Sequence, residues 1–316
     1  MLKKVLILLI VLIVTLVVLE KAYNFFLLKN KDLKTSYILT DKINADVIVT
    51  GSCVPMYMFL PDKFDKYTNL KSYNLSTENA SYSEIFANFY LYLKNNKPPE
   101  YLFIHVSYET FDESFNKFNS YRYAHLLSDS VIANIVKKKE NFYYNISSIP
   151  FMQYAYYNNK INFYMVQGIK HFLFKNKYPY NKNGRIKPID MAWNFKNEKF
   201  IKQNPKGYIF NFSETEFDYL NRIIKLANKN KINVILFETP VYKEFLPYIN
   251  NKYEISGYIA TLAEKNNLQY WNFDTMKIAD DEKYFLSLIN TRDEGSLIFT
   301  KTLAKYFNIH KNINRK

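Results

Sequence analysis

Five short runs of apolar and β-branched residues, separated by segments of helical periodicity, constrain the fold of this 316-residue chain more than any other feature. Strands that alternate with helices pair in parallel, and a parallel sheet is buried on both faces. The alternation therefore predicts an α/β fold. We expect strands at 45–50, 71–75, 101–106, 233–237 and 268–273, and helices at 81–95, 213–230, 253–265 and 296–307.

One predicted helix carries its own start signal. Ser213 is followed three residues later by Glu216, which is the pattern of a capping box. In such a box the serine accepts a backbone N–H of the first helical turn, and the glutamate reaches back to the backbone N–H of the serine. The pattern predicts that the helix begins at Ser213.

Between residues 111 and 208 the alternation is lost, and the sequence becomes dense in Tyr, Phe and Asn, as in Phe142-Tyr143-Tyr144. We interpret this stretch as an insertion, partly helical, that packs against the open end of the sheet. The expected organisation is a membrane anchor at 1–28, followed by an α/β domain at 29–316 that carries the aromatic-rich insertion at about 111–207.

The N-terminus carries an uncharged apolar run at residues 5–19, behind two lysines. Such a run spans about 22 Å of helix, slightly less than a bilayer core. Aromatic residues in 22–28 extend it into an interfacial belt. A cleavable signal peptide needs small residues after its apolar core, whereas Glu20 and Lys21 stand there. We therefore expect one transmembrane helix that is not cleaved off.

The sequence gives weaker signals about the side of the membrane on which the domain lies. Several lysines follow the helix, so the flanking charge does not favour an exported domain. Long C-terminal domains nevertheless cross membranes largely regardless of flanking charge. We expect a single-pass membrane protein with an extracytoplasmic domain, and the resemblance described below supports the same side.

Composition narrows the expected partners. The chain has 43 Lys and Arg against 29 Asp and Glu, a formal net charge of +14. The lysines are mostly scattered, and Lys, Asn, Ile, Tyr and Phe are raised together, as under an AT-rich genome, so no nucleic-acid partner is expected. The single cysteine, Cys53, excludes an internal disulfide and a cysteine zinc site. The four histidines lack metal-ligand spacing, and we expect neither a metal nor a cofactor.

Gly51-Ser52-Cys53 follows the first predicted strand, at the carboxyl end where open parallel sheets bind ligands. A serine there can precede a helix whose N–H groups stabilise a developing oxyanion, as an acyl-transfer nucleophile requires. A Gly-Ser pair after a strand can also serve merely to start a helix. The residues alone leave both interpretations open.

Further motifs recur in a fixed order along the chain. They are Gly51-Ser52, Tyr73-Asn74-Leu75-Ser76 before a helix from Ser81, a strand opening at Pro98-Pro99, Glu238-Thr239-Pro240-Val241-Tyr242, and a block from Tyr284-Phe285 through Gly295 to Phe299-Thr300. In this order the chain resembles the SGNH/GDSL hydrolase superfamily over roughly 45–110 and 208–308. It is most similar to the membrane-anchored members that accompany membrane-bound O-acyltransferases in acylating cell-envelope polymers.

The resemblance implies a three-layer, flavodoxin-like (SGNH hydrolase-like) fold with strand order 2-1-3-4-5. It implies that Ser52 occupies the nucleophile position, with Gly51 and Cys53 in the same binding loop. It also implies that Ser76 lies near the oxyanion hole.

The catalytic base is where the chain departs from the superfamily. Members usually end with Asp-x-x-His, followed five residues later by a glycine that opens the last helix. Counting back from Gly295 places Asn290 at the position of the His and Ser287 at that of the Asp. A neutral amide cannot take the proton of a serine hydroxyl, and general-base catalysis contributes about 10²–10⁴-fold. We therefore expect a degenerate site, with Asn290 close to Ser52.

Other residues could supply a base or a nucleophile. His105 lies within an apolar strand and is expected to be a core residue. His125 and His171 fall in the insertion, where spacing gives them no support. Cys53 could replace Ser52 as nucleophile, yet it lacks a base as well.

The sequence thus predicts a membrane-anchored, SGNH-hydrolase-like protein of the cell envelope, with a degenerate acyl-transfer or esterase domain that assists O-acylation of an envelope glycan. The expected partners are a membrane-bound O-acyltransferase, an envelope glycan, and the membrane itself through the N-terminal helix. Two alternatives remain. One is an active O-acetyltransferase or esterase that uses Ser52 with an unrecognised base, and the other is a purely structural envelope module.

Overall fold

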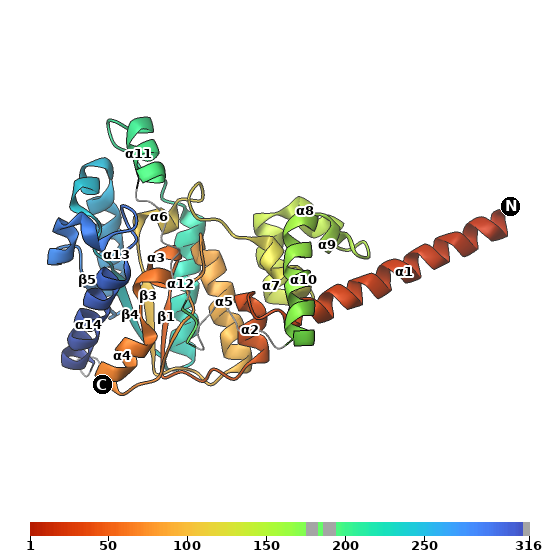
Figure 1. The fold of residues 1–316 in the computed structure, drawn as a ribbon, viewed down its shortest axis with the longest axis horizontal. Coiled ribbons are helices and arrows are strands. Elements are labelled where there is room, and N and C mark those ends of the chain that lie inside the picture. The colour runs from red at the N-terminus through yellow and green to blue at the C-terminus, as the bar shows by residue number, and fades with distance from the viewer. Residues whose placement is uncertain (175–182, 186–193, 312–316) are drawn as a thin grey trace. The chain divides into compact units, whose positions relative to one another are not determined.

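The computed structural model describes residues 1–174, 183–185 and 194–311 (Figure 1). The chain divides into two compact units, one formed by Met1–Lys42 and Phe118–Pro179 and the other by Ile43–Lys117 and Tyr180–Lys316. This grouping by compactness differs from the predicted division into anchor, α/β domain and insertion, which stays a prediction.

A five-stranded sheet forms the centre of the second unit. Its strands are β1 (Val47–Thr50), β2 (Ser72–Asn74), β3 (Tyr101–His105), β4 (Asn233–Glu238) and β5 (Gln269–Asn272). They lie in the order β2-β1-β3-β4-β5, and every neighbouring pair is parallel. The predicted α/β class, the parallel pairing and the strand order are confirmed. All residues of β1, β2 and β3 are buried, as parallel strands between helices require.

Helices connect these strands. They are α3 (Cys53–Met58), α4 (Pro61–Thr68), α5 (Tyr82–Asn95), α6 (Tyr108–Phe111), α11 (Asn194–Gln203), α12 (Glu214–Lys229), α13 (Lys252–Lys265) and α14 (Asp293–His310), with 3-10 helices η2 (Lys243–Tyr248), η3 (Lys277–Asp280) and η4 (Glu282–Tyr284). The last helix begins three residues before the predicted Ser296, because Asp293 and Glu294 occupy its first turn, where acidic side chains complement the helix dipole.

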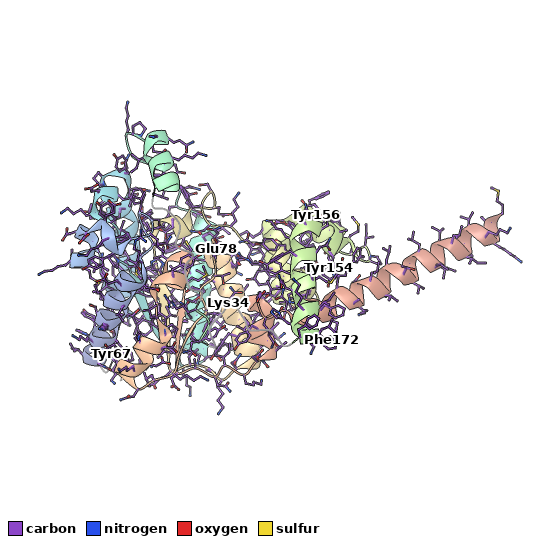
Figure 2. The ribbon with its side chains drawn as sticks, viewed as in Figure 1. Lys34, Tyr67, Glu78, Tyr154, Tyr156 and Phe172 are labelled. Atoms are coloured by element: carbon purple, nitrogen blue, oxygen red, sulfur yellow. The ribbon has the colours of Figure 1, made fainter. Side chains whose placement is uncertain are left out.

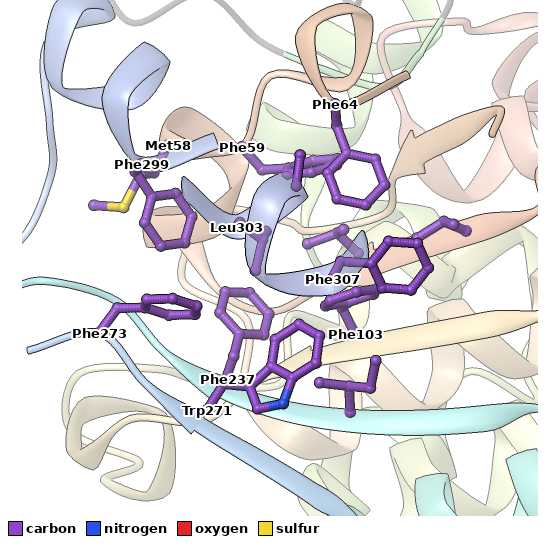
Figure 3. Packing of buried hydrophobic residues seen from close by; sticks show 14 of the residues in the cluster. Met58, Phe59, Phe64, Phe103, Phe237, Trp271, Phe273, Phe299, Leu303 and Phe307 are labelled. Carbon is purple, nitrogen blue, oxygen red and sulfur yellow. The ribbon is translucent and has the colours of Figure 1, made fainter. Parts of the chain in front are cut away.

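The larger hydrophobic core lies between the sheet and α14 (Figure 3). Side chains alternate across a strand, so Val47 and Val49 of β1 share one face with Phe103, Phe237 and Trp271 of the next three strands. That face packs against residues of α14 at helical spacing, which are Phe299, Leu303 and Phe307. The ring of Phe103 lies 5.5 Å from that of Trp271 and 5.6 Å from that of Phe307, between centroids.

Two helices, α5 and α12, contact each other through a buried carboxylate. The Ser213 hydroxyl accepts the Glu216 N–H at 3.4 Å, as a capping box requires. The Glu216 carboxylate, however, accepts the backbone N–H and the hydroxyl of Ser83 at 2.8 and 3.0 Å. The Ser213 N–H donates instead to the Phe111 carbonyl. The predicted capping box is therefore only half formed, because a tertiary contact recruits the glutamate.

The first unit is helical. It contains α1 (Leu2–Lys29), α2 (Lys34–Thr40), the 3-10 helix η1 (Ser120–Leu126), α7 (Ser130–Lys139), α8 (Asn141–Ile146), α9 (Met152–Ala155) and α10 (Asn158–Phe174). Helix α1 is long and apolar enough to cross a membrane, although a signal sequence would meet the same criterion. The apolar window that meets this criterion is not buried within the described structure.

The C-terminal part of α1 belongs to the core of the first unit. Leu27 is buried in a cluster with Tyr154 and Ile161. Gly168 of α10 lies so close to α1 that an added Cβ would be 1.9 Å from the Phe26 carbonyl oxygen. Figure 2 labels Tyr154 and Phe172, whose rings lie 5.3 Å from Tyr23 and 5.4 Å from Phe25, between centroids. The helix is thus packed against its unit and not joined to it by a linker.

Candidate active site

The turn after β1 has no room for a side chain at Gly51. A Cβ there would lie 2.5 Å from Cγ of Pro55 and 2.7 Å from Cβ of His105. Ser52 follows and precedes α3, but its side chain makes no capping hydrogen bond. It is fully buried, and its Oγ has no hydrogen-bond partner within the described part of the chain. In this conformation an external ester cannot reach the hydroxyl.

Cys53 begins α3 and is half-buried. Burial of the thiol, with smaller contributions from the Glu109 and Glu78 carboxylates, raises its pKa to about 12. The thiol is therefore protonated at neutral pH. Because the thiolate is the reactive form of cysteine, Cys53 is a poor replacement for Ser52 as nucleophile.

Ser76 lies beside the Ser52 turn. Its neighbours Leu75 and Thr77 donate their N–H groups to the carbonyls of Val49 (2.7 Å) and Gly51 (3.2 Å), which extends the pairing of β2 with β1. Asn74 organises the same corner, since it accepts the Ser76 N–H at 3.1 Å and donates to the Pro55 carbonyl at 2.8 Å. The structure thus brings Ser76 to the Gly51–Ser52 turn.

Ser287 and Asn290 lie in a tight loop between η4 and α14. The Ser287 hydroxyl oxygen accepts both the backbone N–H and the side-chain amide of Asn290, each at 3.1 Å. The backbone closes the loop, because Phe285 and Thr291 form an antiparallel bridge. The two side chains contact each other through these hydrogen bonds, but neither side chain ionises.

The loop of residues 287–290 meets the α3 region through Ile289. Together with Val54 and His105, Ile289 lines a cavity of about 10 Å³. Such a volume is about what one water molecule needs. This contact brings the loop to the carboxyl ends of the strands. That Ser52 and Asn290 themselves lie close together stays a prediction.

His105 ends β3 at this cavity. Its Nε2 lies 3.1 Å from the Thr239 hydroxyl, and its Nδ1 has no hydrogen-bond partner among the residues described. Burial lowers the pKa of the imidazole to about 3, so it is neutral at physiological pH. The sequence predicted a core histidine, and His105 is indeed buried. Its place at the strand end beside Gly51 was missed, because the predicted strand ran on to Val106.

Two buried carboxylates complete the polar lining of the cavity. Glu109 follows β3, and burial raises the pKa of its carboxyl to about 7. Its Oε2 is without a hydrogen-bond partner in the described residues. Glu238, which ends β4, accepts the Ser256 hydroxyl at 2.8 Å, and Lys252 lies 3.8 Å away. Glu238 comes directly after one predicted strand and Glu109 three residues after another, which is the only local sign that they reach this edge.

No protein-family model and no curated protein matches the chain. Among solved structures, it is similar to a crystal structure from Bacteroides fragilis NCTC 9343 whose assignment as an acylhydrolase is provisional. That alignment covers 83% of this chain and 86% of the other, at 10% identity and a TM-score of 0.39. A likeness of this degree carries no argument about activity, so the functional conclusion depends on the site residues.

Proposed function

We propose that the chain is a membrane-anchored, SGNH-hydrolase-like protein of the cell envelope whose acyl-transfer site has degenerated. In this proposal it assists O-acylation of an envelope glycan beside a membrane-bound O-acyltransferase. One observation carries the proposal: the residues at the expected acid and base positions, Ser287 and Asn290, hydrogen-bond only as neutral groups. The complete burial of Ser52 supports it.

The degenerate site predicts a specific kinetic result. The detergent-solubilised full chain should hydrolyse an aryl acetate no faster than its Ser52→Ala variant. Without a base, the serine hydroxyl stays protonated and contributes nothing to the rate. A rate that the substitution abolishes, and that titrates near neutral pH, would contradict the proposal.

The assisting role has its own test in cells. Deletion of the protein should lower the O-acyl ester content of the envelope glycan. Expression of the Ser52→Ala variant should restore the ester content as fully as the wild-type chain does. Restoration by the wild type alone would show that Ser52 takes part in acyl transfer.

A second candidate function is an active esterase in which His105 is the base. The contact between Gly51 and His105 favours it, because a neutral imidazole then lies beside the Ser52 turn. The low pKa of His105 opposes it: an imidazole of pKa about 3 takes up a proton less readily than an ordinary histidine, by on the order of 5 kcal/mol. Activity lost in both Ser52→Ala and His105→Gln, but kept in Asn290→Ala, would establish this alternative.

A further inference from the structure

An open pocket of about 470 Å³ lies within the first unit. This volume falls in the range of small-molecule sites. One wall is α1 itself, through Glu20, Lys21 and Asn24, and the remaining walls come from the segments around η1, α8 and α9. The pocket is separate from the Ser52 region, since all its residues belong to the first unit.

The position of the pocket along α1 sets its depth relative to a bilayer. The uncharged apolar run ends at Leu19, and Glu20, Lys21 and Asn24 are in the next turns. At 1.5 Å of rise per residue, these turns lie within about 8 Å of the end of the apolar run. If α1 spans a membrane, the pocket therefore opens at the level of the lipid headgroups.

The lining is polar but carries almost no net charge. Lys21 is balanced by Glu20, whose carboxylate accepts the Phe151 N–H at 2.9 Å. Ser147 and Ser148 donate their hydroxyl protons to the backbone carbonyls of Tyr144 and Asn145, at 2.6 and 2.8 Å. The two hydroxyl oxygens therefore face a ligand as acceptors. Such acceptors suit a ligand that donates hydrogen bonds, such as a polyol, whereas the bridging phosphate of a phospholipid diester only accepts them.

His125 is the buried polar group of the pocket. It is 5% exposed, its Nε2 lies 3.1 Å from the Ser36 hydroxyl, and its Nδ1 has no partner among the described residues. Its side chain thus supplies a buried, neutral polar group to the wall of the pocket. The adjoining Phe151 also has a left-handed backbone, with φ of +68°, an uncommon conformation for a bulky residue. Such strain is characteristic of binding sites.

We propose that this pocket binds a neutral, hydroxyl-rich group, such as a sugar ring, presented at headgroup depth by a membrane lipid. The ring of Tyr144 offers an apolar surface against which the C–H face of a sugar can pack. The proposal relies on the membrane anchoring proposed above, but not on the state of the Ser52 site.

The test uses the full chain in lipid nanodiscs that contain a glucosyl diacylglycerol in a phosphatidylcholine background. Native mass spectrometry then counts the glycolipids that the released protein retains. Asn145→Trp fills the pocket from an exposed position of α8, whereas Asn141→Trp places the same side chain one turn away, outside the lining. We expect Asn145→Trp to lower retention about tenfold, equal to about 1.4 kcal/mol, and Asn141→Trp to leave it unchanged.

Other outcomes separate the possibilities. Displacement of the glycolipid by soluble methyl glucoside would support recognition of the sugar ring. It would also show that a soluble saccharide can occupy the pocket. Equal retention of the glycolipid by both tryptophan variants, or no preference over phosphatidylcholine, would overturn the proposal. A chain that fails to enter nanodiscs at all would contradict the membrane anchoring and, with it, the headgroup depth.

Discussion

Ser287 and Asn290 form a closed pair, in which one serine oxygen accepts two hydrogen bonds from the asparagine. They stand at the positions where the resemblance implies an aspartate and a histidine. We predict that Ser287→Asp combined with Asn290→His creates esterase activity that depends on Ser52 once the turn opens to admit the ester to the buried hydroxyl, because an oriented imidazole can then take the serine proton. Aryl-acetate hydrolysis measures the gain, and the triple variant with Ser52→Ala is the control. A folded double variant without activity would show that the oxyanion donors or access to Ser52 are lost too.

Two glycines make a matched comparison of backbone crowding. Gly51→Ala should destabilise the chain by about 1–3 kcal/mol, because the new methyl group meets Pro55 and His105. Gly257→Ala in α13 should stabilise it by about 0.5–1 kcal/mol, since nothing lies within 4 Å of its added Cβ and alanine favours a helix. Urea unfolding of the two variants compares them. Equal free energies of unfolding for the two variants would mean that the turn at Gly51 adjusts to the added methyl group without cost.

The buried Glu216 should matter more than its exposed neighbour in the same turn. Glu216→Gln should cost about 2 kcal/mol, because both hydrogen bonds from Ser83 lose a charged acceptor and one acceptor oxygen becomes an amide donor. Glu214→Gln also removes an acidic group from the first turn of α12 but has no buried partner to lose, so we expect a change below about 0.5 kcal/mol. The midpoints of urea unfolding measure both losses of stability. A larger loss for Glu214→Gln than for Glu216→Gln would contradict the role of the Ser83 contact.

Glu109 should make stability depend on pH. Its carboxyl has a pKa of about 7 in the folded chain against 4.5 as the ordinary value, so between these pH values the folded state binds more protons than the unfolded state. Stability from this group is therefore present below pH 4.5 and falls as the pH rises to 7. Glu109→Gln should match the wild type at low pH and exceed it above pH 7, by up to about 3 kcal/mol.

Denaturation at a series of pH values measures this difference, with the exposed Glu264→Gln as the control. The control variant should follow the wild-type curve throughout. A Glu109→Gln curve parallel to the wild type would mean that Glu109 stays ionised in the folded chain.

Membrane topology is tested by the N-terminal helix. The mature protein should keep its original N-terminus and sediment with membranes, because Glu20 and Lys21 stand where a cleavage site would be. Protease added to intact spheroplasts should digest the domain. Full protection with an intact N-terminus would place the domain in the cytoplasm and contradict an envelope function.

The sequence predicted those features that depend on local pattern. Five strands and the helices after residues 81, 213, 253 and 296 were expected within a few residues, because alternation and helical periodicity are local signals. The strand order came only from the resemblance to the SGNH/GDSL superfamily. The partners of buried polar groups were not predictable. Glu216 bonds to Ser83 across 133 residues, and His105 pairs with Thr239 across 134. Likewise, nothing adjacent to Ser52 in the sequence indicates that it is fully buried.

The continuity of α1 has a mechanical consequence. Residues 20–29 carry the helix from the end of the apolar run to its last residue without a break, over about 15 Å. A flexible linker of that length would let the first unit sample many heights and orientations. A helix that packs through Leu27 and Phe26 instead holds the unit at one height along the helix and in one rotational orientation about the helix axis. One residue inserted just before Glu20 would turn the rest of the unit by about 100° relative to the apolar run, so the length of the helix determines which way the unit faces.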